Sequence, residues 1–269
     1  AMDCAKAMAY FGGRDIPLAA IPTTSGSGSE TTDFAVLTHG KTKYPLVDPR
    51  LRPKLAILDS DLLRELPPAL IADTGFDVLT HAVESATAPG AGTIPGLLAA
   101  EAFRTAYACL PASYAGDTSV RLRLHMASTL AGIAFSHTGL GLCHAMSHAL
   151  GARFHVPHGR LNAILLPAVI ASNAQGAGSG YARLARAAGL GGSADVVALR
   201  NLKNGLIRLR RDLGLPQTLA QAGVSPGQVW GDSKAIVEAV LSDPCCKTNP
   251  VPVEDFQVRR ILEEVTGNL

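Results

Sequence analysis

Four of the eight histidines lie within the segment from Gly141 to Gly159. His144 and His148 are four residues apart, so a helix would place both imidazoles on one face. Pro157-His158-Gly159 then forms a turn-like tripeptide that can bring a third imidazole back toward that helix. The surrounding residues are small and apolar, and imidazoles in such a setting need polar partners. A metal ion can hold several imidazoles at once, and this segment predicts one.

Asp77 and His81, in the segment TGFDVLTHAVE, form a second pair with helical spacing. One such pair is weak evidence, because a simple hydrogen bond between neighbouring helical turns explains it equally well. Two helical pairs together with an imidazole on a turn make a stronger case. One aspartate and three histidines form an oxygen and nitrogen ligand set that suits Fe²⁺, Zn²⁺ or Mn²⁺ and leaves positions open for a substrate.

Other kinds of catalytic site fit the sequence less well. The His144–His148 spacing is that of zinc proteases, but Ala145 stands where their catalytic glutamate would be. Gly26-Ser27-Gly28 lies in a hydroxyl-rich loop, away from the strand-to-helix turn that an activated serine needs. Cys143 has apolar neighbours in a helical pattern, which favours an inert buried thiol.

The pattern of apolar residues indicates an α/β part followed by an all-α part, with the boundary near residue 65. Short strands are predicted at 18–22, 33–37, 44–47 and 55–59, the last of them buried. Between the first two, Thr23 to Glu30 forms a loop of glycines and hydroxyls that can offer N–H groups to an anionic or polyhydroxyl ligand, or act as a linker. The strands 33–37 and 44–47 are predicted to form a pair, with His39-Gly40-Lys41 at the turn. Helical spacing marks the segments 73–86, 94–110, 119–136, 143–154, 160–173, 179–188, 193–213, 225–241 and 253–265.

The composition excludes several classes of protein. The chain has 269 residues, 47% of them hydrophobic and 17% charged, and a formal net charge of +2. This near-neutral balance argues against nucleic-acid binding. No apolar run reaches the length of a membrane span. Five cysteines without CxxC spacing predict reduced thiols and a cytoplasmic location.

Several segments together resemble one known family. The chain contains, in this order, IPTTSGSGSETT, KYPL, LAILD, TGFDVLTHAVE, GLGLCHAMSHALGARFHVPHG and TNPVP. This series resembles the iron-containing (group III) alcohol dehydrogenase family along the whole chain. Within that family it is most similar to the propanol and ethanol dehydrogenases of bacterial microcompartments, which implies a location inside such a compartment.

The resemblance implies two domains and a site between them. Residues 1–65 would be the C-terminal half of a Rossmann-like NAD-binding domain, and residues 66–269 a dehydroquinate-synthase-like helical metal-binding domain. His148 would be the catalytic residue, beside the nicotinamide. The ligands of Fe²⁺, or of Zn²⁺, would be Asp77, His81, His144 and His158. The NAD(H) contacts would be Thr23, Thr24, Thr32, Lys43 and Leu62.

In this family a GGGS loop that cradles the pyrophosphate precedes the segment AMDCAKA, with which this chain begins. We therefore expect an N-terminally truncated chain in which the first half of the cofactor domain is absent. For the full-length protein we expect reversible NAD(H)-linked reduction of a short-chain aldehyde, of the propionaldehyde or acetaldehyde type. The alternatives are a glycerol-dehydrogenase-like polyol oxidoreductase, a metal-dependent lyase or synthase on the same scaffold, and a catalytically silent metal-binding fragment. Expected partners are the small substrate, further copies of the chain, and microcompartment shell or enzyme proteins.

Overall fold

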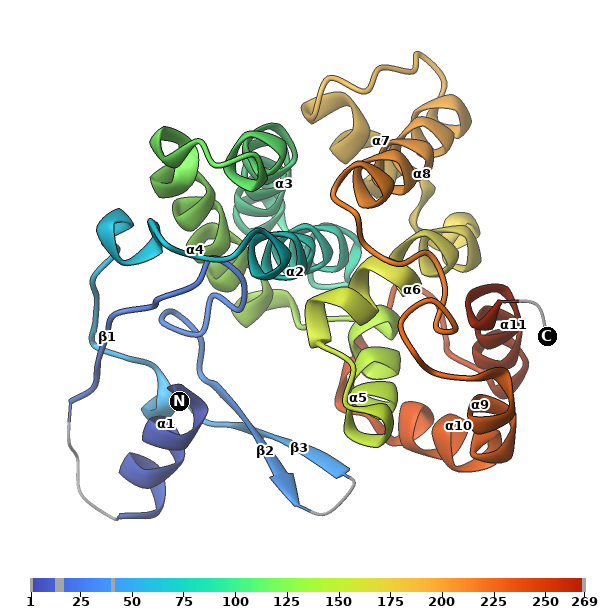
Figure 1. The fold of residues 1–269 in the computed structure, drawn as a ribbon, viewed down its shortest axis with the longest axis horizontal. Helices are drawn as coiled ribbons and strands as arrows, with labels where there is room; N and C mark the ends of the chain where they lie inside the picture. The colour runs from blue at the N-terminus through green and yellow to red at the C-terminus, as the bar shows by residue number, and fades with distance from the viewer. Residues whose placement is uncertain (1, 13–16, 40–41, 268–269) are drawn as a thin grey trace.

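The computed structural model describes residues 2–12, 17–39 and 42–267. Helices dominate it, as Figure 1 shows. The α-helices are α1 (Met2–Phe11), α2 (Pro68–Thr87), α3 (Thr93–Tyr114), α4 (Arg121–Thr138), α5 (Leu142–Phe154), α6 (His158–Ser172), α7 (Ala174–Ala187), α8 (Asp195–Asp212), α9 (Pro226–Gly231), α10 (Ser233–Ser242) and α11 (Asp255–Thr266). Short 3-10 turns are η1 (Pro49–Leu51), η2 (Ser60–Leu63), η3 (Thr118–Val120) and η4 (Pro244–Thr248).

The helical part of the sequence prediction is confirmed, with one difference. The predicted helix 225–241 is two helices, α9 and α10, which meet at Asp232. Gly231, Asp232 and Ser233 all have low helix propensity, and this weak run allows the axis to break. No helix of the described segments is both long enough and apolar enough to cross a bilayer.

The strands form two small sheets. β2 (Phe34–His39) and β3 (Thr42–Val47) form the predicted pair of strands, and they are an antiparallel hairpin in the register Phe34↔Val47. β1 (Ala19–Ala20) pairs in parallel with β4 (Leu55–Ala56). The predicted turn of this hairpin, His39 to Lys41, lies partly outside the described residues.

The predicted buried strand 55–59 is wrong in two respects. Only Leu55 and Ala56 are regular strand, and the side chains of Leu55 and Ile57 are 54% and 43% exposed. Their exposure has a simple cause, because β1 is the only described strand beside β4. A run of apolar residues predicts a buried strand, but no layer of the described chain covers this one.

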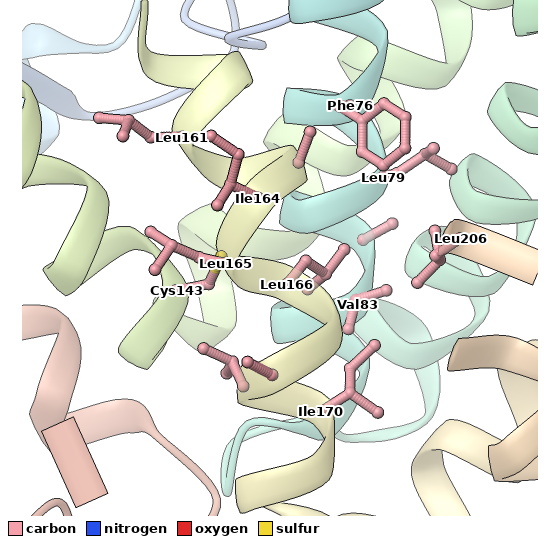
Figure 2. Close-up of a cluster of buried hydrophobic side chains, with 14 of the residues drawn as sticks. Phe76, Leu79, Val83, Cys143, Leu161, Ile164, Leu165, Leu166, Ile170 and Leu206 are labelled. Atoms are coloured by element: carbon pink, nitrogen blue, oxygen red, sulfur yellow. The ribbon is translucent and has the colours of Figure 1, made fainter. Parts of the chain in front are cut away.

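Helix α2 lies at the centre of the helical part. From Ile71 to Ala86 all but one of its residues are buried, and α3, α4, α6 and α7 all pack against it. A helix that is buried on all sides belongs to a core. Figure 2 shows Phe76, Leu79 and Val83 of α2 in one cluster with Ile164 and other apolar side chains of α6. Any functional group on α2 is therefore held in a rigid frame.

The start of α6 comes unusually close to α2. A Cβ atom at Gly159 would collide with the backbone carbonyl of Asp73 in α2. Glycine is needed here for the close approach of two backbones, since its φ is ordinary. The contact fixes His158, the first residue of α6, beside the first half of α2.

Replacing Gly159 with alanine is expected to destabilise the fold. The added methyl forces α6 away from α2, and overpacking of this kind costs about 1–3 kcal/mol of unfolding free energy. The matched control is Gly178→Ala in α7, where a Cβ would meet nothing within 4 Å. Because alanine has a higher helix propensity than glycine, this control substitution should raise the unfolding free energy by up to about 1 kcal/mol. Urea unfolding followed by circular dichroism measures both, and equal effects of the two substitutions would contradict the packing argument.

Candidate metal centre and adjoining cavity

Helix α2 presents three ionisable side chains along one face. Asp77, His81 and Glu84 occupy positions i, i+4 and i+7, and they are 8%, 4% and 5% exposed. Charged groups this deep in a helical core need compensating partners. Those partners come from α5 and α6.

A sharp connection between α5 and α6 brings the other histidines to α2. Helix α5 ends at Phe154, and His155 takes the left-handed conformation with φ of 56° that commonly closes a helix. Pro157 is the N-cap residue of α6 and His158 begins it. The tripeptide Pro157-His158-Gly159 was predicted as a turn, but it is the start of α6, because His158 and Gly159 are already helical. The predicted return of His158 to His144 is confirmed, with 5.2 Å between the ring centroids.

The imidazoles of these helices surround one carboxylate oxygen. Nε2 of His81, His144 and His158 lies 3.7, 3.6 and 3.5 Å, respectively, from Oδ1 of Asp77. Ligand atoms of Asp77, His144 and His158 all lie within 4.8 Å of one another. Two atoms that each bind one ion at about 2.1 Å in tetrahedral geometry are separated by about 3.4 Å. The spacing is thus long for direct hydrogen bonds and suitable for shared ligands of a metal.

The buried Nε2 of His144 supports this assignment, because no hydrogen-bond partner satisfies it. A buried ring nitrogen without a partner costs free energy that a bound cation would recover. The residues present therefore fit a divalent metal ion.

Glu84 orients His144 from behind. Its Oε2 lies 2.6 Å from Nδ1 of His144 and also accepts the N–H of Gly141 at 2.9 Å, while Oε1 accepts the N–H of Cys143 at 2.7 Å. Two of these donors lie at the N-terminus of α5, where the helix dipole favours a negative charge. A carboxylate on Nδ1 directs the lone pair of Nε2 toward Asp77, as in other metal sites that contain histidine.

The electrostatics of the metal-free cluster follow from burial and charge. Burial lowers the pKa of His81 to about 4, so this ring is neutral at pH 7 and can donate a lone pair. Burial also disfavours protonated His144, but the nearby carboxylates outweigh that cost and raise its pKa to about 9. For Asp77, burial favours the neutral acid, whereas the three imidazoles hold its pKa well below the usual range. A cation that binds must therefore displace the proton of His144 and take over its charge.

Asn162 of α6 ties the cluster together. Its Nδ2 donates to Oδ1 of Asp77 at 2.8 Å and lies 3.3 Å from Nε2 of His158. Its Oδ1 accepts a hydrogen bond from Ser147 of α5. Neither Glu84 nor Asn162 was predicted from the sequence, although each continues a helical spacing, at i+7 from Asp77 and at i+4 from His158.

His148 lies beside this cluster and has a different partner. Its ring stacks on that of His158 with 5.4 Å between centroids, and its Nδ1 is 2.9 Å from Oδ2 of Asp243. Asp243 precedes η4, 95 residues further along the chain. No sequence spacing could have linked these two residues.

A cavity of about 410 Å³ opens onto the cluster. Its metal side is lined by Asp77, His81, His144, His148 and His158, and its far side by residues of α1, the hydroxyl loop and the hairpin, among them Asp3, Ser27, Thr32 and Phe34. The cavity is therefore bordered by both the helical part and the N-terminal segment. A small substrate and a larger ligand such as a cofactor could both reach the side chains around Asp77 from it.

Of the predicted cofactor residues, Thr32 alone is among the residues described as lining this cavity. Thr32 lines it, and Lys6 of α1 holds Thr32 through hydrogen bonds to its carbonyl at 2.8 Å and its hydroxyl at 3.0 Å. Thr23 and Thr24 lie earlier in the chain, at the start of the hydroxyl loop, and neither is among the residues that line the cavity. Leu62, in η2, is 46% exposed and away from the lining. Lys43 belongs to β3, and its side chain is outside the described residues.

Glu84→Gln is expected to weaken metal binding about 10–100-fold, because loss of the partner behind a ligating histidine typically has this effect. The substitution keeps the shape of the side chain but removes the charge that orients His144. Glu101→Gln, on the exposed side of α3, is the matched control and should leave metal affinity unchanged. Competition with a chelator measures both. Unchanged affinity in Glu84→Gln, with the fold intact, would show that Glu84 has no role in the metal site.

Comparison with known proteins identifies the family of this chain. The family model for the C-terminal part of Fe-containing alcohol dehydrogenases matches residues 71–266, and the model for iron-containing alcohol dehydrogenase matches residues 1–60. A solved 1,3-propanediol oxidoreductase superposes with a TM-score of 0.91 at 31% sequence identity, covering 98% of this chain and 74% of that one. An iron-containing alcohol dehydrogenase from Thermococcus thioreducens gives 0.89 at 33% identity, with the same coverage of 98% and 74%.

Among curated proteins, the chain is 41% identical to the 1-propanol dehydrogenase PduQ of Salmonella typhimurium, over 98% of this chain and 75% of that protein. It is 38% identical to an NADPH-dependent butanol dehydrogenase of Clostridium saccharobutylicum, over 91% of this chain and 63% of that protein. The chain belongs to the iron-containing alcohol dehydrogenase family.

Proposed function

We propose that the intact protein is a metal-dependent alcohol dehydrogenase that reversibly reduces a short-chain aldehyde to a primary alcohol with NAD(H). The observation that carries this proposal is the set of Asp77 and three imidazoles on the wall of a cavity that also borders the hydroxyl loop. The similarity to a 1-propanol dehydrogenase favours an aldehyde of about three carbons. A glycerol-dehydrogenase-like activity on polyols is the alternative.

We assign the metal to Asp77, His81, His144 and His158, with Fe²⁺ as the first expectation and Zn²⁺ as an accepted substitute. A divalent ion there supplies Lewis acidity for a carbonyl or alkoxide oxygen, and the nicotinamide supplies or accepts the hydride. The chain's own contribution is to hold the ligands rigidly. Asp77 and His81 lie on the buried central helix, and Glu84 keeps the lone pair of His144 directed at the site.

We assign His148 to the proton path. Its Nδ1 is held by Asp243, which leaves the other ring nitrogen to exchange a proton with the cavity. Asp243 can hold the ring in this way because its own carboxyl is kept ionised. Burial alone would raise the pKa of Asp243, but the hydrogen bonds from His148 and from the backbone of Cys245 lower it overall.

The cavity favours a small, mostly apolar substrate. Phe135, Leu140 and Val36 contribute apolar wall beside the imidazoles, and Phe135 stacks on His81 with 4.5 Å between ring centroids. Such a wall excludes water from the carbonyl group and suits a short alkyl chain.

For the cofactor we propose that residues 1–65 belong to a Rossmann-like domain and residues 66–269 to a dehydroquinate-synthase-like helical domain. The proposed NAD(H) contacts are Thr23, Thr24, Thr32, Lys43 and Leu62. Support comes from the parallel pairing of β1 with β4 and from the place of Thr32 on the cavity wall. Further copies of the chain, and microcompartment shell or enzyme proteins, are proposed as partners from the resemblance of its motifs to the propanol and ethanol dehydrogenases of bacterial microcompartments.

The test is an assay of the intact protein loaded with Fe²⁺. Oxidation of NADH, or of NADPH, should depend on propionaldehyde, and glycerol should support little reduction of the oxidised cofactor. Preference for glycerol would favour the polyol alternative, and no turnover with either substrate would contradict the proposal.

His158→Ala should lose both metal and activity. Removing one ligand and the Lewis acid with it is expected to lower kcat/KM at least about 100-fold. His137→Ala is the matched control, because His137 is exposed and bonds only to the carbonyl of Ile133 in its own helix. Metal content by mass spectrometry should fall in the first variant and stay constant in the second. A His158 variant that keeps stoichiometric metal would overturn the ligand assignment.

A further inference from the structure

A second group of metal-binding side chains lies on the wall of the same cavity. His148 of α5, with Asp243 and Cys245 at the start of η4, offers three ligand atoms that all lie within 4.8 Å of one another. The three side chains are separate from the four assigned to the catalytic metal. His148 and Cys245 both line the cavity, so a small cation can reach them.

The backbone of η4 fixes this group in place. Oδ1 of Asp243 accepts the N–H of Cys245 at 2.9 Å, while Oδ2 of the same carboxylate is 2.9 Å from Nδ1 of His148. The side chains of Asp243 and His148 are only 6% and 11% exposed. One carboxylate thus positions both the thiol and the imidazole, which is the preorganisation that a metal site requires.

We propose that His148, Asp243 and Cys245 form a second cation site, for a thiophilic divalent ion such as Zn²⁺ or Cd²⁺. Imidazole nitrogen, carboxylate oxygen and thiolate sulfur are the ligands that zinc takes in proteins. The hard cations Mg²⁺ and Ca²⁺ prefer oxygen ligands alone and are excluded by this set. The neighbouring Cys246 is occupied elsewhere, since its Sγ lies 3.0 Å from the carbonyl of Val240.

Binding releases the proton of the Cys245 thiol. Asp243 is already ionised, and the thiolate rather than the thiol binds a metal ion, so this proton passes to solvent. Burial raises the pKa of Cys245, which keeps this thiol protonated until a thiophilic ion displaces the proton. The site therefore selects among divalent cations by their affinity for sulfur as well as by their charge.

Occupation of this site would engage His148. If the proton path assigned above is correct, and this consequence rests on the proposed function, a bound Zn²⁺ inhibits the enzyme. The binding itself does not depend on that function, so the two can be tested separately.

Cadmium titration of the metal-free chain tests the site. A Cd²⁺–thiolate bond has its own ultraviolet charge-transfer absorption, so this band reports the cysteine ligand directly. The band of the wild-type chain should reach the intensity of about one Cd²⁺–thiolate bond per chain after about two equivalents, because the site at Asp77 also takes up Cd²⁺, and Mg²⁺ should produce no competing effect. Cys245→Ser, which exchanges one atom, should abolish the band and weaken this binding at least tenfold. Cys246→Ser is the matched control and should keep the band.

A third variant separates this proposal from the catalytic metal site. Asp77→Ala should lose the other cation and retain the thiolate band, so failure of the catalytic assignment leaves this test intact. Circular dichroism verifies the fold of each variant. A wild-type chain without the band, a band that survives in Cys245→Ser, or a band that disappears in Cys246→Ser would each overturn the proposal.

Discussion

The site depends on the burial of two carboxylates in an apolar helical core. Asp77 and Glu84 lie on the central helix α2, where an ionised carboxylate without partners would be prohibitively costly. Imidazoles from α5 and α6 and the N–H groups that begin α5 provide the compensation. Because the two carboxylates are fixed by the core, the helices that compensate them must dock in one arrangement. The need to compensate the buried charges and the packing of the apolar core therefore specify the same arrangement of α2, α5 and α6.

The helices had to approach closely for this compensation to work. His158 reaches Asp77 only because Gly159 allows the backbone of α6 to touch that of α2. The left-handed conformation of His155 tightens the connection between α5 and α6, so that the chain reverses direction within a few residues. Loss of either feature would move His158 relative to a carboxylate that cannot follow it. The position that His158 must take beside Asp77 therefore restricts the conformation of the short connection between α5 and α6.

Local periodicity explains how much the sequence could predict. The helices and the pairs Asp77–His81 and His144–His148 repeat at helical spacing, so the residues alone locate them. Asp243 could not be found in this way, because its contact with His148 is made only when η4 folds back on α5. The predicted burial of Leu55 and Ile57 was wrong for a related reason, since the sequence of an apolar strand is the same whether or not a neighbouring element covers it.

The cavity also needs the N-terminal segment, within which a single buried ammonium joins α1 to Thr32 and β2. Lys6 is fully buried, and its Nζ bonds to the carbonyls of Thr32 and Phe34 at 2.8 and 2.9 Å. Burial lowers the pKa of Lys6 to about 8, so the charge is retained at neutral pH at some cost. A hydrophobic contact would tolerate sliding of α1 along β2, whereas three directed bonds do not. The part of the cavity wall that α1, Thr32 and β2 form is therefore held by directed hydrogen bonds.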